Sequence, residues 1–291
     1  MIDRSKDSLP PAQLTQTQPS DLNLRSALPA QSRTGIDPAL YGDLVFYFQY
    51  ASSAYSLLCL RPNGNHLVSH FTNASANTQG FVARDDGRKE LVVAIRGSAT
   101  LPDILLDSQI LLVPFISPGA KLPKSARVHA GFLLAWDSVS LEVIALVKHQ
   151  LTHYPDYTIV AVGHSLGGAV ATLAAMCLEQ SCKKRVKLFT YGAPRAGNEG
   201  FAAYVNARIG LDAFRVVNTN DGVPTIIPRS LGYHHHGVEY WIYNDTPSAE
   251  NTTMCSADGE DPTCSASIPS RGVDLAHTAY FRIMVGTPYC L

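Results

Sequence analysis

A serine between two glycines separates segments of opposite character in the middle of this chain. The pentapeptide 163–167 (GHSLG) follows the apolar run 157–162 and precedes a run of small residues typical of a helix, 168–178. A strand, a sharp turn and a helix in this order expose a serine hydroxyl beside a base and an anion-binding pocket. Glycines on both sides of the serine relieve crowding in so tight a turn. The pattern favours Ser165 as a nucleophile over an ordinary glycine-rich turn whose serine caps a helix.

A nucleophilic serine needs a base and an acid that orients it. In one recurrent chain order, the acid follows the serine and the histidine comes last. Asp221 lies just past the expected strand 214–218, at the sheet edge where Ser165 emerges, although it also suits a plain turn. His277 follows a loop with glycine and proline and precedes the apolar segment 279–285. Position therefore favours Asp221 and His277, while chain order alone leaves other downstream carboxylates and histidines open.

The other histidines near the expected site have simpler interpretations. His234 to His236 form a rival cluster that suits either a solvated loop or a metal site. Three successive residues cannot all point at one metal ion, and no Cys/His spacing partners them, so we expect no metal site. His164 adjoins Ser165, but the tight turn directs its side chain toward the interior, where we expect a structural role.

Two hydrogen-bond donors for an oxyanion can also be located. The backbone N–H of Leu166, the residue after the nucleophile, lies at the N-terminus of the expected helix. The loop 96–98 follows the buried strand 91–95, whose end lies next to Ser165 in the expected sheet. We therefore expect Leu166 and Ser98 to form the oxyanion hole.

Composition narrows the class of protein. The chain has 291 residues, 46% of them hydrophobic and 16% charged, which is enough for one large α/β domain or two small ones. Its net charge of −1, with no run of Lys or Arg, argues against a nucleic-acid partner. The longest apolar stretch, 104–116, is interrupted at 107–109 and is shorter than the roughly 18 residues of a membrane span. We expect a monomer without a transmembrane segment.

Strands and helices alternate along most of the chain. Expected strands are 81–84, 91–95, 157–162, 186–191, 214–218 and 238–243, and expected helices are 39–58, 129–153, 168–178 and 198–209. This alternation implies a mostly parallel central sheet covered by helices, with reactive loops at the carboxyl ends of its strands. Residues 1–34 lack periodicity and are interpreted as a disordered leader or propeptide, and 35–291 as a single catalytic domain.

Cysteine usage indicates an oxidising compartment. The chain has six cysteines, a Cys255 and Cys264 pair in a loop of turn residues, and N-glycosylation acceptors at Asn73, Asn244 and Asn251. We therefore expect a secreted protein rather than a cytosolic one with six free thiols. Because the first 33 residues lack the apolar core of a signal peptide, we infer that the numbering starts after a removed signal, with an added first methionine.

Five motifs, in order and with plausible spacing, closely resemble the secreted fungal class 3 lipases, a family that also contains fungal feruloyl esterases. They are 157–168 (YTIVAVGHSLGG), 191–198 (YGAPRAGN), 219–224 (TNDGVP), 239–241 (EYW) and 276–281 (AHTAYF), and the resemblance extends over about residues 38–291. The resemblance implies the α/β-hydrolase fold with a short lid over the active site. It also implies a triad of Ser165, Asp221 and His277, with Ser98 and Leu166 as the oxyanion hole.

The resemblance bears on the cysteines as well. It implies that Cys59 pairs with Cys290 and that Cys255 pairs with Cys264. The lipases of the family often carry a short-range disulfide just after the lid, and 118–128 here has no cysteine. Cys177 and Cys182 could instead bridge where the nucleophile helix frays, or Cys177 could be a buried thiol, since their spacing inside a helix points them apart.

The segment 99–110 distinguishes the two branches of the family. Its apolar residues Leu101, Ile104, Leu105 and Leu106 form one stripe at helical spacing, with two aspartates opposite. The lipases use such a segment as a flap that swings onto an oil–water interface. In the feruloyl esterases it is polar, with a tyrosine where Ile110 stands here. The alternative is a fixed loop packed over the core.

These features together predict a secreted serine carboxylic ester hydrolase without a cofactor, a lipase that acts on water-insoluble acylglycerols through an acyl-enzyme intermediate. Its partner is then a lipid or ester substrate at an oil–water interface. The segment 240–264 nevertheless resembles the esterases, so a feruloyl-type or sterol esterase of the same fold is the alternative. A non-catalytic binding module of hydrolase-like fold is a third, less favoured interpretation, because all three triad residue types are present.

Overall fold

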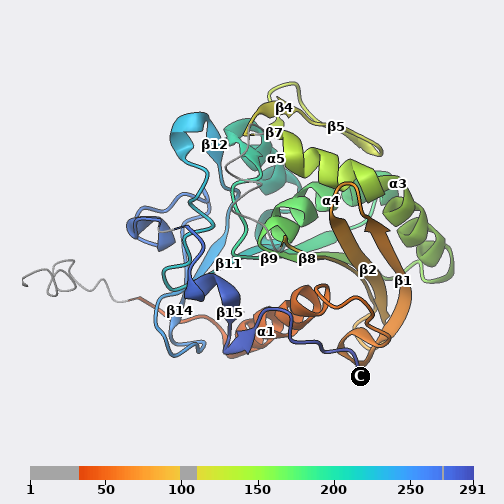
Figure 1. Cartoon of the computed structure of the whole chain (residues 1–291), viewed down its shortest axis with the longest axis horizontal. Helices are drawn as coiled ribbons and strands as arrows, with labels where there is room; N and C mark the ends of the chain where they lie inside the picture. Colours follow the sequence, from red (N-terminus) through yellow and green to blue (C-terminus); the bar gives the residue numbers. More distant parts are fainter. Residues whose placement is uncertain (1–32, 99–109, 271) are drawn as a thin grey trace, which may run out of the picture. The chain divides into compact units, whose positions relative to one another are not determined.

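An eight-stranded sheet runs through the middle of the protein, seen in a computed structural model that describes residues 33–98, 110–270 and 272–291 (Figure 1). Its strand order is β1-β2-β3-β8-β9-β11-β13-β14. The strands are β1 (His66–Asn73), β2 (Thr78–Asp85), β3 (Glu90–Ile95), β8 (Thr158–His164), β9 (Val186–Tyr191), β11 (Ala213–Asn218), β13 (Glu239–Ile242) and β14 (Thr252–Met254). The five strands from β3 to β13 pair in parallel, and the outer strands pair antiparallel. The expected mostly parallel sheet is confirmed.

Helices cover both faces of this sheet (Figure 1). They are α1 (Pro38–Ser53), α3 (Ala130–His153), α4 (Leu166–Cys182) and α5 (Glu199–Arg208). One apolar cluster joins α1 to one face of β3, β8 and β9, and another joins α3 and α4 to the opposite face. Because parallel strands are buried on both faces, β3 and β8 contain the continuous apolar runs 91–95 and 159–162. The arrangement is that of the α/β-hydrolase fold.

Short elements connect and flank this framework. A second sheet has the order β12-β10-β7-β4, from β4 (Leu112–Pro114), β7 (Arg127–His129), β10 (Gly197–Asn198) and β12 (Tyr233–His234). Two hairpins are formed by β5 (Ile116–Ser117) with β6 (Ala120–Lys121), and by β15 (Ala279–Tyr280) with β16 (Ile283–Met284). Single 3₁₀ turns are η1 (Pro62–Gly64), η2 (Gly210–Asp212), η3 (Arg229–Leu231), η4 (Ser265–Ser267) and η5 (Leu275–Thr278).

The first helix begins as expected but ends early. The Asp37 side chain accepts hydrogen bonds from the backbone N–H groups of Ala39 and Leu40, so it caps α1 before Pro38. The expected helix 39–58 was too long, because α1 stops at Ser53. The next residues form a loop that leads to Cys59, which is bonded to Cys290.

The structure contains both disulfides that the resemblance implies, Cys59–Cys290 and Cys255–Cys264. Cys177 and Cys182 are not bridged. Cys177 is a buried thiol that accepts a hydrogen bond from Trp136 Nε1 at 3.1 Å, and burial raises its pKa to about 11. Of the two alternatives for this cysteine, the buried thiol is correct.

One helix in the described part of the chain, α3, is long and apolar enough to cross a membrane by length and composition alone. Its buried residues, among them Phe132, Trp136 and Val143, belong to the apolar cluster that α3 shares with α4 and the sheet. The core helix of a globular fold has this same character, and we interpret α3 in that way.

Candidate active site

Ser165 lies at a sharp turn between β8 and α4. Its backbone has φ 61° and ψ −135°, a strained conformation for a residue with a side chain. The neighbouring glycines make room for the turn: a Cβ on Gly163 would lie 2.2 Å from the carbonyl oxygen of Gly167, and one on Gly167 would lie 2.3 Å from that of Ile95. The spacing of the GHSLG pentapeptide is therefore a steric requirement of this turn.

The structure brings Ser165, His277 and Asp221 together in one chain of hydrogen bonds. Ser165 Oγ lies 2.9 Å from His277 Nε2, and His277 Nδ1 lies 2.9 Å from Asp221 Oδ2. All three residues are buried. Because the carboxylate only accepts, Nδ1 carries the ring proton, and Nε2 is left with a lone pair for the serine hydroxyl. This arrangement can take a proton from Ser165.

Two further groups hold the Asp221 carboxylate. Tyr280 donates its hydroxyl to Oδ2 at 2.5 Å, and the backbone N–H of Val223 donates to Oδ1 at 2.9 Å. Tyr280 was missed by the residue-by-residue reasoning from sequence, although it lies within the AHTAYF motif. A tyrosine three positions after an expected base histidine is the signal that could have indicated it.

Gly192, in the loop after β9, allows these side chains to meet. It has φ +56°, and a Cβ there would lie 2.5 Å from Asp221 Oδ2, 2.8 Å from the Tyr280 hydroxyl and 2.9 Å from His277 Nδ1. The absence of a side chain at residue 192 is thus a condition for the contact between acid and base. This role was also missed by the sequence reasoning.

The η5 turn delivers His277 to the sheet edge. The His277 backbone N–H is bonded to the Asp274 carbonyl at 3.1 Å, and Asp274 also caps the turn through its side chain. Asn218, the last residue of β11, donates its side-chain amide to the carbonyls of Ala276 and Ala279. The histidine loop is therefore tied to the strand that precedes Asp221.

The two expected oxyanion donors lie near Ser165. Leu166 is the first residue of α4, where backbone N–H groups have no partner within the helix. The loop 96–98 follows β3, which pairs in parallel with β8. A Cβ on Gly97 would lie 3.0 Å from Ser165 Cβ, so this loop packs directly against the serine.

The expected lid lies mostly outside the described residues. Leu101, Ile104, Leu105 and Leu106 fall in the stretch 99–109, of which the structure gives no account. Ile110 is described and packs, partly buried, against the apolar cluster that contains Leu166.

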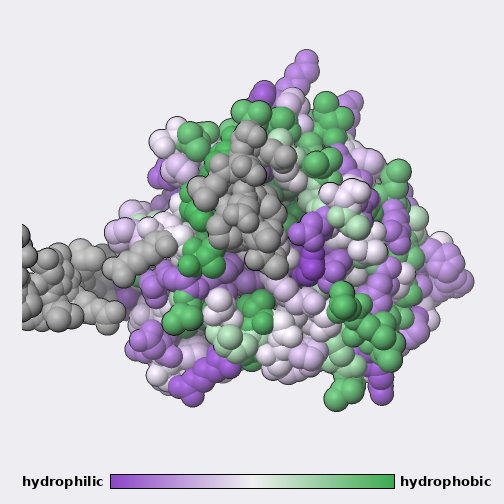
Figure 2. Space-filling view, viewed as in Figure 1, coloured by the Kyte–Doolittle hydropathy of each residue, from purple (hydrophilic) through white to green (hydrophobic). Residues whose placement is uncertain are grey.

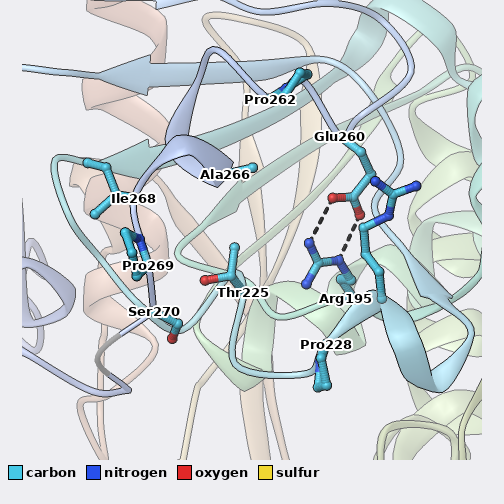
Figure 3. A pocket seen from close by; sticks show the side chains of 10 residues that line it. Arg195, Thr225, Pro228, Glu260, Pro262, Ala266, Ile268, Pro269 and Ser270 are labelled. Atoms are coloured by element: carbon cyan, nitrogen blue, oxygen red, sulfur yellow. Dashed lines mark hydrogen bonds and ion pairs between the residues drawn. The ribbon is translucent and has the colours of Figure 1, made fainter. Parts of the chain in front are cut away.

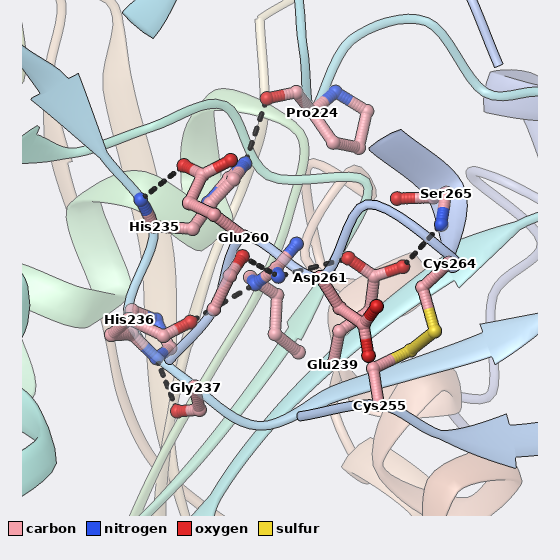
Figure 4. Close-up of polar contacts among 12 residues, drawn as sticks. Pro224, His235, His236, Gly237, Glu239, Cys255, Glu260, Asp261, Cys264 and Ser265 are labelled. Carbon is pink, nitrogen blue, oxygen red and sulfur yellow. Dashed lines mark hydrogen bonds and ion pairs between the residues drawn. A yellow bond between two sulfur atoms is a disulfide. The ribbon is translucent and has the colours of Figure 1, made fainter. Parts of the chain in front are cut away.

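His234 to His236 do not join the triad. His235 and His236 are buried, with His235 Nε2 bonded to the Pro224 carbonyl and His236 Nδ1 to the Gly237 carbonyl (Figure 4). The solvated-loop interpretation was wrong for these two residues. Burial lowers the pKa of His236 to about 4 and that of His235 well below its ordinary value.

Two buried ion pairs surround these histidines. Arg195 forms a bidentate pair with Glu260, and Arg215 lies 2.9 Å from Glu239. Glu260 also accepts the His235 backbone N–H, and Glu239 accepts that of Ser265 (Figure 4). Glu239 lies close to Cys255 and Cys264, but the two sulfurs are bonded to each other and offer no thiolate to a metal. The cluster ties residues 255–265 to β11 and β13.

A surface pocket of about 410 Å³ lies beyond the Asp221 loop (Figure 3). Ser270, on its wall, donates its hydroxyl to the carbonyl of Gly222, the residue after Asp221. The pocket contains no triad residue; it is lined by Arg195, Thr225, Pro228, Arg229, Glu260, Pro262, Ala266, Ile268, Pro269 and Ser270.

Ser165 lies on a strand–turn–helix at the carboxyl edge of a parallel sheet and is hydrogen-bonded to His277, which is in turn hydrogen-bonded to Asp221. This arrangement defines the α/β-hydrolase class. The family model "Lipase (class 3)" matches residues 92–231. The chain is 36% identical to a lipase of Rhizopus niveus over 230 residues, 78% of this chain and 56% of that protein. It is 30% identical to a secreted alkaline triacylglycerol lipase of Penicillium cyclopium over 262 residues, 89% and 90% of the two chains. This chain belongs to the class 3 lipase family.

A solved structure agrees with this assignment. The crystal structure of a lipase from Rhizopus microsporus var. chinensis has a TM-score of 0.78 and 34% identity to this chain, covering 89% of this chain and 92% of the other. The chain spans only 56% of the length of the Rhizopus niveus relative. The family expected from the five motifs is confirmed.

Proposed function

We propose that this protein is a lipase, a serine carboxylic ester hydrolase that acts on water-insoluble acylglycerols without a cofactor. The observation that carries the proposal is the unbroken hydrogen-bond chain from Ser165 through His277 to Asp221, within a chain of the class 3 lipase family. The Penicillium cyclopium relative is itself named a triacylglycerol lipase.

In the first half of the proposed reaction, Ser165 Oγ attacks the carbonyl carbon of the ester. His277 Nε2 takes the serine proton, and Asp221 keeps the imidazole oriented and stabilises the imidazolium that forms. The Leu166 N–H and Ser98 receive the oxyanion of the tetrahedral intermediate. When the ester bond breaks, the leaving alcohol takes the proton from His277, and the acyl group stays on Ser165.

The second half restores the enzyme. His277 takes a proton from a water molecule, whose oxygen attacks the acyl carbon, and a second tetrahedral intermediate forms at the same donors. Its collapse releases a carboxylic acid and returns the proton to Ser165 Oγ. Asp221 remains a carboxylate throughout, held by hydrogen bonds from Tyr280 and Val223.

An oil–water interface suits the surface around this site. Leu275, two residues before His277, is 86% exposed, and Leu111, just after the proposed lid, is 63% exposed. Figure 2 shows hydrophobic residues alternating with polar ones on one face of the molecule.

Initial rates on tributyrin across its solubility limit, beside methyl ferulate on the same preparation, test the proposal. A jump in rate when droplets appear, with little ferulate cleavage, supports an interfacially active lipase. Saturation below the solubility limit with good ferulate turnover would favour the alternative, a feruloyl-type esterase. The Cys255–Cys264 loop, whose sequence resembles the esterases, is the observation that keeps this alternative in the test. A third assay with sterol esters tests the alternative of a sterol esterase.

A non-catalytic binding module is distinguished by chemistry rather than by substrate. An organophosphonate bonds covalently only to an activated serine, so labelling of Ser165 would exclude a non-catalytic module. Mass spectrometry of the Ser165 peptide detects the label. If the folded protein is not labelled, Ser165 is not an activated nucleophile, and the proposed serine hydrolase is contradicted.

The proposal includes secretion, with 35–291 as a single catalytic domain and 1–34 as a leader or propeptide. Two disulfides and a relative named a secreted lipase support secretion. The compact unit Thr34–Leu291 supports the division of the chain. Asn73, Asn244 and Asn251 are the proposed glycosylation sites. Mass spectrometry of protein secreted from a eukaryotic host, before and after glycosidase treatment, tests these sites and the processed N-terminus together.

A further inference from the structure

A tyrosine outside the triad contacts the residue before the nucleophile and, through it, reaches the loop of the base histidine. Tyr55 follows α1, and its hydroxyl lies 2.8 Å from His164 Nδ1. His164 precedes the nucleophile, and its other ring nitrogen, Nε2, lies 3.0 Å from the backbone carbonyl of His277. One side chain thus reaches the base histidine through a single intervening ring.

The same hydroxyl also meets the oxyanion loop. Burial raises the pKa of Tyr55, and the nearby Gly97 backbone opposes this effect. A Cβ on Gly97 would lie 2.1 Å from that oxygen and 2.7 Å from the His164 carbonyl. Glycine at this position therefore lets the loop that precedes Ser98 close onto Tyr55.

The chemistry of these groups fixes every donor. A backbone carbonyl only accepts, so His164 Nε2 carries a proton and donates it to His277. In the neutral ring Nδ1 then has a lone pair, and Tyr55 must donate to it. His164 is neutral, since complete burial lowers its pKa well below the ordinary value and the nearby His277 lowers it further. Tyr55 therefore donates to His164, and His164 donates to His277.

The rings of His164 and His277 lie close together, with centroids 4.5 Å apart. A change of tautomer at His164 would turn the Nε2 lone pair toward the His277 carbonyl, and two acceptors would then face each other. The His277 carbonyl therefore fixes the tautomer, and the Tyr55 hydroxyl holds the ring in this position by donating to Nδ1. The position of the base histidine therefore depends on a hydroxyl outside the triad.

We propose that Tyr55 is a positioning residue for the ester hydrolysis described above. Through His164, it holds the oxyanion loop, the nucleophile turn and the His277 loop in their relative positions. The inference rests on the proposed function for its catalytic consequence. Its structural part, the hydrogen bond from Tyr55 that holds the His164 ring, does not depend on any substrate.

The kinetic test is Tyr55→Phe, which keeps the ring and removes only the hydroxyl. We expect kcat on a soluble ester such as p-nitrophenyl butyrate to fall about 5–10-fold, with KM changed less than about twofold, because orientation rather than binding is lost. Tyr50→Phe is the matched control: Tyr50 is a fully buried α1 tyrosine whose hydroxyl accepts from Asn65, remote from the triad. It should lower Tm to a similar extent and leave kcat within about twofold.

A spectroscopic test accompanies the kinetics. In ¹⁵N-histidine-labelled wild-type protein, the His164 resonances, assigned by their loss in His164→Gln, should show a single Nε2–H tautomer. In Tyr55→Phe the same ring should keep this tautomer, because the His277 carbonyl still accepts from Nε2, while its Nδ1 resonance should shift on loss of the hydrogen bond from the hydroxyl. A wild-type His164 ring protonated at Nδ1 would overturn the inference, and so would an unchanged kcat in folded Tyr55→Phe. If wild-type protein cleaves no ester, the proposed function fails, while the spectrum still decides whether Tyr55 fixes His164.

Discussion

Three groups donate hydrogen bonds to one buried carboxylate at Asp221: His277, Tyr280 and the Val223 backbone. Asp221→Asn would replace one accepting oxygen with an amide that donates. The amide favours the wrong tautomer of His277, so Nε2 would carry a proton and could not accept one from Ser165. We expect kcat to fall by about 10⁴. Steady-state kinetics with circular dichroism as a folding control measure this, and near-normal activity would place the acid elsewhere.

Ser98 is a second residue whose side chain can be tested alone. If its hydroxyl donates to the oxyanion, Ser98→Ala should lower kcat about 10²–10³-fold with little change in KM, because the interaction forms only in the transition state. Ser98→Thr retains a hydroxyl and should keep most of the activity. A loss below threefold in the alanine variant would remove this side chain from the oxyanion hole and leave only its backbone there.

Individual site residues could be predicted to different degrees. The turn that carries Ser165 was predictable because strand, turn and helix are all local to residues 157–178. Asp221 and His277 remained open from local sequence, and the family resemblance selected them. Tyr280 and Tyr55 escaped residue-by-residue analysis because their roles depend on contacts with residues 59 and 109 positions away. No periodicity records such contacts.

Among the elements, the turn after β9 offers the sharpest steric test. Gly192→Ala would place a methyl group within 3 Å of atoms of Asp221, Tyr280 and His277, at φ +56°. We expect kcat to fall at least 10²-fold, because shifts of about 1 Å between reacting groups have that effect. Gly210→Ala is a matched control, since Gly210 has φ +57° but nothing within 4 Å of an added Cβ.

Comparing Gly192→Ala with Gly210→Ala separates the effect of backbone strain from the effect of steric contact with the triad. Both variants should lose about 1 kcal/mol of stability to the left-handed backbone, and only Gly192→Ala should lose activity. Equal kcat values for the two folded variants would show that the triad tolerates displacement by the β9 loop. Urea unfolding and steady-state kinetics on both proteins provide the comparison.

The long, apolar elements were predictable and the short ones were not. β9 was predicted to the residue, and α3 and α5 to within one residue at each end, because their patterns extend over six or more positions. β1 and the second sheet were missed. β1 is partly exposed with an irregular pattern, and the strands of the second sheet have only two or three residues, too few to show a period.

At the scale of the whole molecule, buried histidines in several elements make the stability depend on pH. His129, His164, His235 and His236 are all buried, and burial lowers their pKa values, to about 4 for His129 and His236. In the unfolded chain each would titrate near its ordinary pKa of about 6.5. The unfolded state therefore binds more protons below that pH, and stability that is complete above pH 6.5 is lost as the pH falls toward 4.

His236→Gln isolates one of these contributions. With a pKa near 4 when folded and 6.5 when unfolded, His236 should account for about 2 kcal/mol of the stability lost between pH 7 and pH 5. We therefore measure the free energy of unfolding in urea at pH 7 and at pH 5. The decrease between the two should be about 2 kcal/mol smaller in His236→Gln than in wild type. His149→Gln, at an exposed position of α3, is the control and should keep the wild-type difference. A general destabilisation lowers the unfolding free energy equally at both pH values, so it does not affect the difference between the two free energies. Equal pH dependence in His236→Gln and wild type would mean that this histidine binds its proton in the folded protein as readily as in the unfolded chain.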